Sequence, residues 1–330
     1  LIDSTESFAF ATMITARSGT LDFNSPVTMS PTGTLRFEVS PGTSGWASFM
    51  VSTQVDGGIS PVGSFTIFVS PVVHFVKENQ ENPGNGRSWD QSFAGLSEAL
   101  THAHEGDEIR LSKGTYYAAG APERTATFRI KQGVQIRGGF DGTESGNSPT
   151  DPGARSTLSG LFKVEDGRVQ RAAIVVTAEQ VDENTLLESL VIRGGGGSLI
   201  GRTVSGAGLV CELASPTLRK LAIIDNLAVN NGAGIYLSRS DSTIDRCFIG
   251  NNLSSRNGGG IYLGSFTNVR VINSVISGNR AFEGGGGIAA LTFNSNFTLI
   301  NSTIANNITT RGSGGIEVRT TQATIRNSIV

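Results

Sequence analysis

A repeat of 26–28 residues fills the second half of the chain and limits its possible fold more than any other feature. Glycine-rich turns run five times into a short apolar stretch, which begins at Leu209, Ile235, Ile261, Ile288 and Ile316. A second marker keeps the same spacing and consists of Asn226, Asn252, Asn279 and Asn307. A third marker is a residue pair ending in an aliphatic side chain, which opens at 217, 243, 270, 298 and 324. Three markers with one period indicate a repeat architecture.

The contents of each repeat decide which architecture this is. Short β-branched runs such as 235–237 and 269–272 alternate with Gly or Asn turns, without the 3.6-residue period of a helix. Helical solenoids are therefore excluded, and the spaced leucines of leucine-rich repeats are missing. We predict an all-β parallel solenoid with three short strands and three turns in each coil. Its regular coils cover 181–330 and its less regular coils cover 72–180.

In such a solenoid, each strand pairs with its equivalent one coil away, about 4.8 Å along the axis, so equivalent residues stack. We expect the aliphatic column inside and the asparagine column at a turn, where the amides bond to one another and the backbone is left-handed. These markers are therefore interpreted as structural. Cys211 should face inward beside Leu237, and Cys247 should lie near the register of Ser274. Two buried thiols are thus expected rather than a disulfide.

The two segments before the repeat have different patterns. Phe93, Leu96, Leu100 and Ala103 fall at helical spacing and predict one amphipathic helix, which can cover the first coil. His102 and His104, near its end, are interpreted as solvated. Residues 1–71 alternate strictly, as in 35–39 and 65–69, which is typical of an antiparallel β-sandwich. The chain lacks an initial Met and stops inside a repeat strand, so we expect a piece of a longer protein.

Composition excludes several classes of protein. Charged residues make up 16% of the chain, against roughly a quarter in ordinary globular proteins. The net charge is −2 without a basic block, so nucleic acids and anionic membranes are poor candidate partners. No apolar run approaches the roughly 20 residues of a membrane span. From Cys247 to Val330 there is no Asp, Lys or His, so no Ca²⁺ cage of carboxylates is expected there.

Several segments resemble known families. Between His74 and Gly160 the chain contains GRSWDQSFAGLSEAL, EGDEIRLSKGTYY, ATFRIKQGVQIRGGFDGTES and STLSG. These resemble the first part of bacterial right-handed parallel β-helix proteins of the pectin-lyase-like superfamily. GGGIYLGSFTNVRVINSVISGN and GGGGIAALTFNSNFTLINSTIANN resemble the repeats of polymorphic outer membrane proteins, although a literal FxxN occurs only at 248–251. TGTLRFEV, SGWASFMVSTQVDGG and SFTIFV, within 1–71, are similar to cadherin-like or Ig-like modules.

The resemblance implies a right-handed parallel β-helix over 72–330, an incomplete Ig-like or cadherin-like sandwich over 1–71, and an extracellular or bacterial cell-surface location. Many relatives on this fold are polysaccharide lyases or glycosidases, which need carboxylates, and the lyases also need a base. The candidate catalytic carboxylates are Asp225, Asp241 and Asp245, which share one coil. Ca²⁺ is implied only for a lyase; otherwise we predict neither metal nor cofactor.

A binding face is expected on the strand that follows each glycine turn. If Ile235 points inward, Tyr236 points outward, and Tyr262 stacks on it one coil later, offering an aromatic surface suited to sugar rings. The alternative is that the two rings only stiffen the sheet. Glu317 and Arg319 occupy equivalent outward positions in the last repeat.

Two functions remain open. The acid-poor coils and uncharged polar surface favour a non-enzymatic surface protein, whose β-helix is a rigid stalk or an adhesin-like surface for a polysaccharide or a cell-surface ligand. The alternative is a polysaccharide lyase or glycoside hydrolase of the pectin-lyase-like type. A third interpretation, a structural assembly component, predicts a large flat apolar side wall.

Overall fold

The computed structural model describes residues 11–19, 21–30, 34–40, 43, 45–55, 58–69, 71–78, 80–118, 124–164, 167–199, 202–203, 205–319 and 322–330. Contacts divide the chain into two units. One consists of Leu1–Val72 with His104–Gly106, and the other of Val73–Ala103 with Asp107–Val330.

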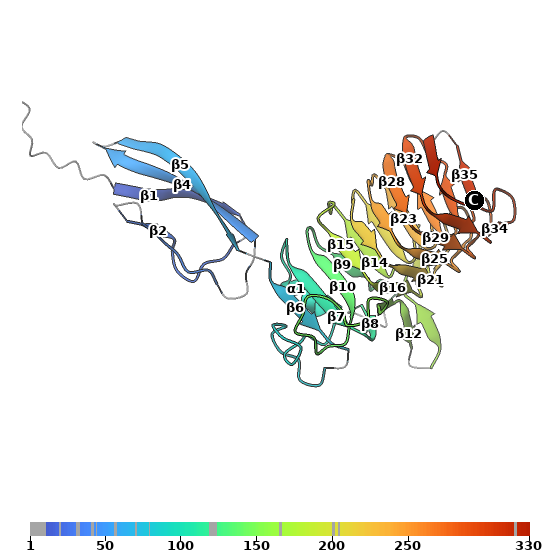
Figure 1. Ribbon diagram of the computed structural model, residues 1–330, viewed down its shortest axis with the longest axis horizontal. Helices are drawn as coiled ribbons and strands as arrows, with labels where there is room; N and C mark the ends of the chain where they lie inside the picture. The colour runs from blue at the N-terminus through green and yellow to red at the C-terminus, as the bar shows by residue number, and fades with distance from the viewer. Residues whose placement is uncertain are drawn as a thin grey trace, which may run out of the picture. The chain divides into compact units, whose positions relative to one another are not determined.

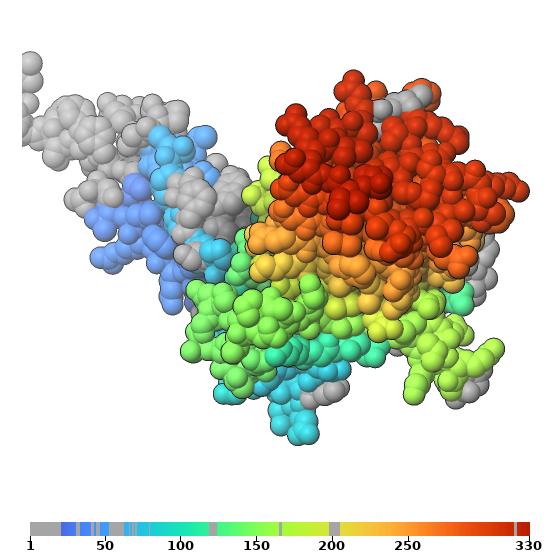
Figure 2. All heavy atoms as spheres, turned by 45° about the vertical axis from the view of Figure 1, so that its right-hand side comes forward, coloured from blue at the N-terminus to red at the C-terminus, as the bar shows by residue number. Residues whose placement is uncertain are grey.

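The second unit is a parallel β-solenoid of about seven coils (Figure 1), and its coils follow one another from green to red in Figure 2. Three parallel sheets run along it, as predicted. The long sheet contains β6 (Val73–Val76), β7 (Glu108–Ser112), β10 (Gln135–Phe140), β15 (Leu186–Glu188), β20 (Thr217–Arg219), β24 (Thr243–Asp245), β28 (Thr267–Ile272), β32 (Ser295–Ile300) and β36 (Gln322–Arg326). The second sheet contains β8 (Thr115–Tyr117), β11 (Ser156–Ser159), β16 (Leu190–Arg193), β21 (Ala222–Ile224), β25 (Phe248–Gly250), β29 (Val275–Ser277) and β33 (Thr303–Ala305). The third sheet contains β9 (Phe128–Ile130), β14 (Val176–Glu179), β19 (Leu209–Glu212), β23 (Ile235–Ser238), β27 (Ile261–Leu263), β31 (Ile288–Ala290) and β35 (Ile316–Val318).

A fourth, short parallel sheet was not predicted. Its strands directly follow the asparagine markers and are β22 (Leu227–Ala228), β26 (Leu253–Ser254), β30 (Arg280–Ala281) and β34 (Ile308–Thr309). Two residues are too short a run for strand alternation to be recognised in a sequence. Two hairpins also leave the solenoid, namely β12 (Leu161–Lys163) with β13 (Val169–Arg171) and β17 (Ser198–Leu199) with β18 (Arg202–Thr203).

The predicted asparagine ladder is confirmed. Asn226 Nδ2 donates to Asn252 Oδ1 at 3.0 Å, and Asn252 Nδ2 donates to Asn279 Oδ1 at 2.9 Å. Asn279 Nδ2 continues the ladder to Asn307 Oδ1 at 3.0 Å. The prediction of left-handed geometry is wrong for these asparagines themselves. The left-handed residue is the one before each, such as Asn251 (φ 56°), because the corner must turn before the amide can point inward.

Glycine in the turn is explained by this ladder. A Cβ on Gly234 would lie 2.5 Å from the carbonyl oxygen of Gly260 and 3.0 Å from Asn252 Nδ2. Any side chain there would displace either the neighbouring coil or the ladder. The aliphatic column is buried as predicted, and Leu209, Ile235 and Ile261 pair in sequence along the third sheet.

The two cysteines lie where the repeat places them. Cys211 pairs with Leu237, and the Cys247 N–H donates to Ser274 Oγ at 3.0 Å. Both thiols are free and buried, and burial raises the pKa of each to about 12.

The predicted helix is confirmed as α1 (Leu96–His102). Leu96, Ala99 and Leu100 are buried, and the helix packs against β6 and β9, the first strands of the long and third sheets. It therefore covers the beginning of the solenoid interior. His102 stacks on Phe93 with ring centroids 5.1 Å apart.

The first unit contains two small antiparallel sheets. One joins β1 (Ala11–Gly19), β4 (Gly45–Val55) and β5 (Gly58–Val69), and the other joins β2 (Thr28–Met29) and β3 (Leu35–Arg36). Leu21, Phe49 and Ile67 are buried in one cluster, against which Leu35 packs. Assignment of this unit to an Ig-like or cadherin-like module, with its boundary at residue 71, stays a prediction.

Candidate functional site

The three predicted catalytic aspartates occupy different positions of their coil. Asp225 lies at the corner after β21, with Oδ2 3.6 Å from Arg193 Nη2. Asp245 ends β24 and accepts hydrogen bonds from Arg246 Nε at 2.9 Å and Asn273 Nδ2 at 3.2 Å. The exposed Asp241 precedes β24, and its N–H donates to Ser215 Oγ. Asp225 and Asp245 are thus each paired with a neighbouring arginine.

The predicted tyrosine stack is present but offers less surface than expected. The rings of Tyr236 and Tyr262 are 5.6 Å apart and 3° from parallel. Tyr262 is only 8% exposed, and burial raises the pKa of both phenols. The glycine turn passes close to this residue, since a Cβ on Gly258 would lie 2.8 Å from Tyr262 Cβ. The expectation of an exposed aromatic surface is therefore wrong for Tyr262.

Glu317 and Arg319 form a local pair. Arg319 Nη2 donates to Glu317 Oε1 at 2.8 Å, and the Ser313 N–H donates to Oε2 at 3.2 Å. The Glu317 side chain is 13% exposed and that of Arg319 is 69% exposed. Of the two, Arg319 has the more exposed side chain.

A charged cluster on the long sheet escaped the sequence analysis. Arg137, Glu188 and Arg219 are in register on β10, β15 and β20. Arg219 donates two hydrogen bonds to Glu188, from Nε to Oε1 at 3.0 Å and from Nη2 to Oε2 at 2.9 Å. Arg137 Nε lies 3.2 Å from Oε2, and Lys220 Nζ lies 3.3 Å from Oε1. One carboxylate therefore faces three cations.

These neighbours fix the charge state of Glu188. The residue is 8% exposed, and burial alone would raise its pKa. The hydrogen bonds and positive charge of Arg219, with the charges of Arg137 and Lys220, outweigh burial and hold the pKa below its ordinary value. Glu108 Oε1 lies 3.7 Å from Arg137 Nη1 and 2.8 Å from Arg110 Nε. The six residues of this cluster thus carry two more cations than carboxylates.

A cavity of about 270 Å³ opens beside the cluster, and we call it the Glu188 cleft. Its charged lining residues are Arg137, Glu188 and Lys220, and its opposite wall includes Ser148, Pro149 and Pro152. That wall belongs to the loop 141–155, which follows β10.

Hydrogen bonds within this loop, and from Arg110 in the solenoid, fix its course. Glu144 accepts the N–H groups of Gly142 at 2.9 Å and Thr143 at 3.1 Å. Burial opposes its ionisation, but these backbone bonds prevail and lower its pKa. Arg110, packed against the rings of Phe75 and Phe140, donates to the carbonyl of Gly146 at 3.1 Å. The cleft therefore has two fixed walls.

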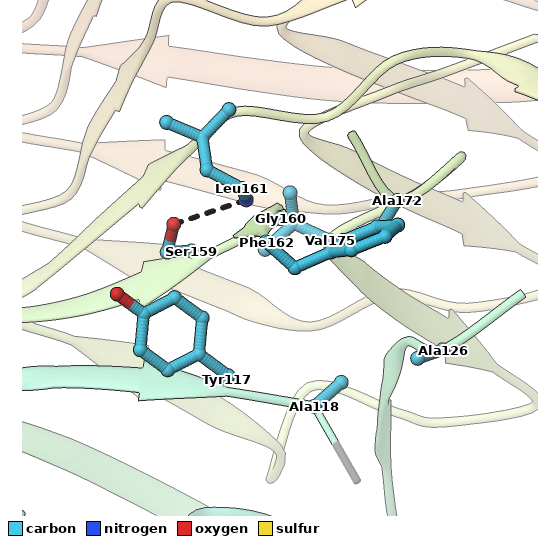
Figure 3. A pocket seen from close by; sticks show the side chains of 9 residues that line it. All are labelled: Tyr117, Ala118, Ala126, Ser159, Gly160, Leu161, Phe162, Ala172 and Val175. Carbon is cyan, nitrogen blue, oxygen red and sulfur yellow. Dashed lines mark hydrogen bonds between the residues drawn. The ribbon is translucent and has the colours of Figure 1, made fainter. Parts of the chain in front are cut away.

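A second hollow is apolar. Figure 3 shows Tyr117, Phe162 and Val175 around a pocket of about 10 Å³ beside the hairpin β12–β13. A wider space of about 430 Å³ adjoins Tyr117, Phe162 and Val169, with Lys163 as its charged neighbour. Among the described residues that line it, only Lys163 and Tyr117, through its hydroxyl, carry a polar group that could orient a ligand.

Two further features are absent from the described residues, namely a metal-binding cluster and a membrane-spanning helix. No group of three or more His, Cys, Asp or Glu side chains there is arranged to hold a metal ion. Likewise, the described part of the chain contains no helix that is long and apolar enough to cross a membrane.

Comparison with known proteins agrees with the sheet topology. Residues 171–330 match the family model "Right handed beta helix region". The same three sheets continue upstream to β6, β8 and β9, so the second unit is a right-handed parallel β-helix. No curated protein matches the chain.

Two solved structures resemble the chain at low identity. Pectate lyase Pel9A is 14% identical with a TM-score of 0.40, and the match covers 77% of this chain and 78% of that one. A family 28 exopolygalacturonase from Yersinia enterocolitica is 11% identical with a TM-score of 0.26, covering 90% of this chain and 83% of that one.

Proposed function

We propose that this protein is an extracellular or cell-surface β-helix protein that binds an acidic polysaccharide in the Glu188 cleft without cleaving it. The observation that carries this proposal is the single carboxylate facing Arg137, Arg219 and Lys220 beside an open cavity. Excess positive charge in a cavity attracts an anionic group, and arginine and lysine donate charge-assisted hydrogen bonds to carboxylate or sulfate.

The cleft suits binding better than the acid–base chemistry of a glycosidase. Glycosidases use two carboxyl groups, one of which has a raised pKa and acts as the acid. Glu188 is the one carboxylate among the described residues that line the cavity, and its pKa is lowered. Its ion pairs hold the Glu188 carboxylate in place. The same ion pairs orient the side chains of Arg137, Arg219 and Lys220.

The test is binding of polygalacturonate, measured by titration calorimetry and compared with neutral dextran. We expect binding of polygalacturonate alone, weakening as salt is raised. Lys220→Gln and Arg137→Gln should each weaken it about tenfold, since each removes a charge-assisted hydrogen-bond donor. Arg239→Gln, the same charge change at an exposed corner after β23, should leave it unchanged.

Two results would count against the proposal. Equal weakening by all three substitutions would mean that binding follows net charge rather than the cleft. Unsaturated products or new reducing ends from acidic or neutral polysaccharides, with or without Ca²⁺, would instead support the lyase or glycosidase alternative.

A further inference from the structure

The outer face of the fourth sheet is apolar. Leu227, Leu253, Arg280 and Ile308 form one outward column on β22, β26, β30 and β34. Val229 and Phe282 lie two residues further along their own coils. The five apolar side chains of this set are between 36% and 55% exposed. We call this face the side wall. Large exposed apolar patches rimmed by polar residues mark interaction sites on protein surfaces.

The charges around the side wall are mostly positive. Arg280 stands in the column itself, and the Arg311 guanidinium lies 5.1 Å from the centre of the Phe282 ring. Arg256 is close to Glu283, Nε to Oε1 at 3.8 Å. Glu283 also accepts a hydrogen bond from Asn257 Nδ2 at 2.9 Å. A second carboxylate near the side wall, that of Glu317, lies against Gly284 and Gly312. The three arginines thus outnumber the two carboxylates.

This local charge differs from that of the whole chain. Residues 247–330 contain six arginines and two glutamates, without Lys or Asp, whereas the whole chain has a net charge of −2. The whole-chain value argued against anionic membranes as partners. Salt, however, screens the charges of the protein beyond about 10 Å at 0.1 M, so a partner bound at the side wall interacts mainly with the charges near it. The side wall therefore presents positive charge to a partner even though the whole chain is slightly negative.

We propose that the side wall docks onto the surface of an anionic lipid bilayer. Leucine, valine, isoleucine and phenylalanine side chains have no polar atoms and suit the boundary between headgroups and acyl chains. Arginine binds phosphate through a planar, bidentate arrangement of donors. Charge complementarity therefore favours anionic over neutral lipid. This site is separate from the Glu188 cleft and does not depend on its function.

The experiment is co-sedimentation of the full chain with unilamellar vesicles. We expect binding to vesicles of phosphatidylcholine and phosphatidylglycerol in equal parts, and little binding to phosphatidylcholine alone. Arg280→Gln should weaken binding about fivefold, the effect of one basic residue near an anionic surface. The double variant Leu253→Ser with Ile308→Ser should abolish it, because it removes apolar contact from two strands of the wall.

Matched controls distinguish binding by the side wall from nonspecific binding by other exposed apolar or basic residues. Phe293→Ser removes an exposed aromatic ring between β31 and β32, and Arg270→Gln removes an exposed arginine from β28. Both should bind vesicles as the parent chain does, and circular dichroism verifies that each variant is folded.

Several results would overturn this proposal. They are absence of binding to either vesicle, equal binding to both vesicles, and unchanged binding by folded side-wall variants. Sedimentation velocity adds one more, since a parent dimer that Leu253→Ser with Ile308→Ser converts to a monomer would assign the wall to a second copy.

Discussion

Cys247 occupies a column that serine fills in the next three coils. The Ser274 N–H donates to Ser302 Oγ at 3.0 Å, and the Ser302 N–H donates to Ser328 Oγ at 3.1 Å. Each serine hydroxyl also donates to a nearby carbonyl, as Ser302 does to Ile300 at 2.8 Å. The Cys247 thiol makes the equivalent, weaker contact with the carbonyl of Asp245 at 3.4 Å. Cysteine and serine therefore make the same kind of contact in this column, with the carbonyl two residues earlier.

Substitutions in this column should differ in cost. Cys247→Ser places the hydroxyl used by the later coils, so we expect the free energy of unfolding to change by less than about 1 kcal/mol. Ser302→Ala leaves the Ser274 N–H without its acceptor and should cost about 1–3 kcal/mol. Urea unfolding of the two variants checks this, and equal costs would contradict the ladder interpretation.

Glu188 should make stability depend on pH. Its folded-state pKa is lowered, so its ion pairs stabilise the fold above the ordinary value of 4.5 and are lost as pH falls through the lower, folded-state value. Glu188→Gln should therefore cost about 1–3 kcal/mol at pH 7, and this difference from the parent chain should shrink below about pH 4.5.

Chemical unfolding at a series of pH values measures this effect. Glu179→Gln is the matched control, because Glu179 is largely exposed and its ion pair with Arg129 spans 4.0 Å. It should change stability by less than about 1 kcal/mol at any pH. A cost of Glu188→Gln that is the same at pH 3 and pH 7 would contradict the assigned charge state.

At the scale of structural elements, the corner after the second sheet is stabilised by side chains as well as backbone. Asn252 Oδ1 accepts both the N–H and the side-chain amide of Asn226, at 3.1 and 3.0 Å. Its Nδ2 donates to the carbonyl of Ile223 at 2.9 Å. The ladder thus satisfies buried backbone groups that the strands leave unpaired.

Asn252→Ala should destabilise the solenoid by about 2–5 kcal/mol, because the Asn226 N–H and the Ile223 carbonyl both lose buried partners. Asn268→Ala, an exposed position on the outer face of β28, should change stability by less than about 0.5 kcal/mol. Thermal unfolding followed by circular dichroism compares the two. A similar, small effect of both substitutions would show that the ladder contributes little.

The elements that follow the repeat could be predicted from the sequence, because identical side chains recur at one spacing. The Asn252 ladder and the Cys211 and Cys247 registers are examples. The Glu188 cleft could not, because its members change identity from coil to coil. Arg137, Glu188 and Arg219 occupy the third position of QIR, LLE and TLR. Extending the marker pair at 217 upstream would have aligned them, but the early coils depart from the 26–28-residue period.

The site also depends on the loop 141–155, whose course is set by contacts remote in sequence. Trp89 Nε1, for example, donates to the carbonyl of Glu144 at 3.0 Å, across 55 residues of chain. For the tyrosine stack, the sequence predicted the register of the residues correctly but not their exposure. The exposure of Tyr262 depends on how the surrounding coils pack, which the repeat spacing does not encode.

At the scale of the whole molecule, the solenoid has its own continuous core. Among the described residues, its buried cluster begins at Val76 and includes none from 1–71. We therefore expect a variant made of residues 72–330 to fold alone and to bind polygalacturonate with the affinity of the full chain. Far-ultraviolet circular dichroism and calorimetry test this. An unfolded variant, or one that folds but binds more weakly, would contradict the boundary predicted at residue 71.

The stacking of the coils also makes the β-helix a ruler. Every coil advances the chain by one interstrand distance, about 4.8 Å, whatever its loops contain. We therefore expect that a coil of 26–28 residues can be inserted or removed, provided that an Asn stays at the corner to bond to its neighbours. Lys220 of the Glu188 cleft and Leu227 of the side wall belong to one coil, so it is the distance from the cleft to the far end of the side wall, at Ile308, that can change only in whole coils. Related proteins with more or fewer repeats would carry side walls of graduated length beyond the same cleft.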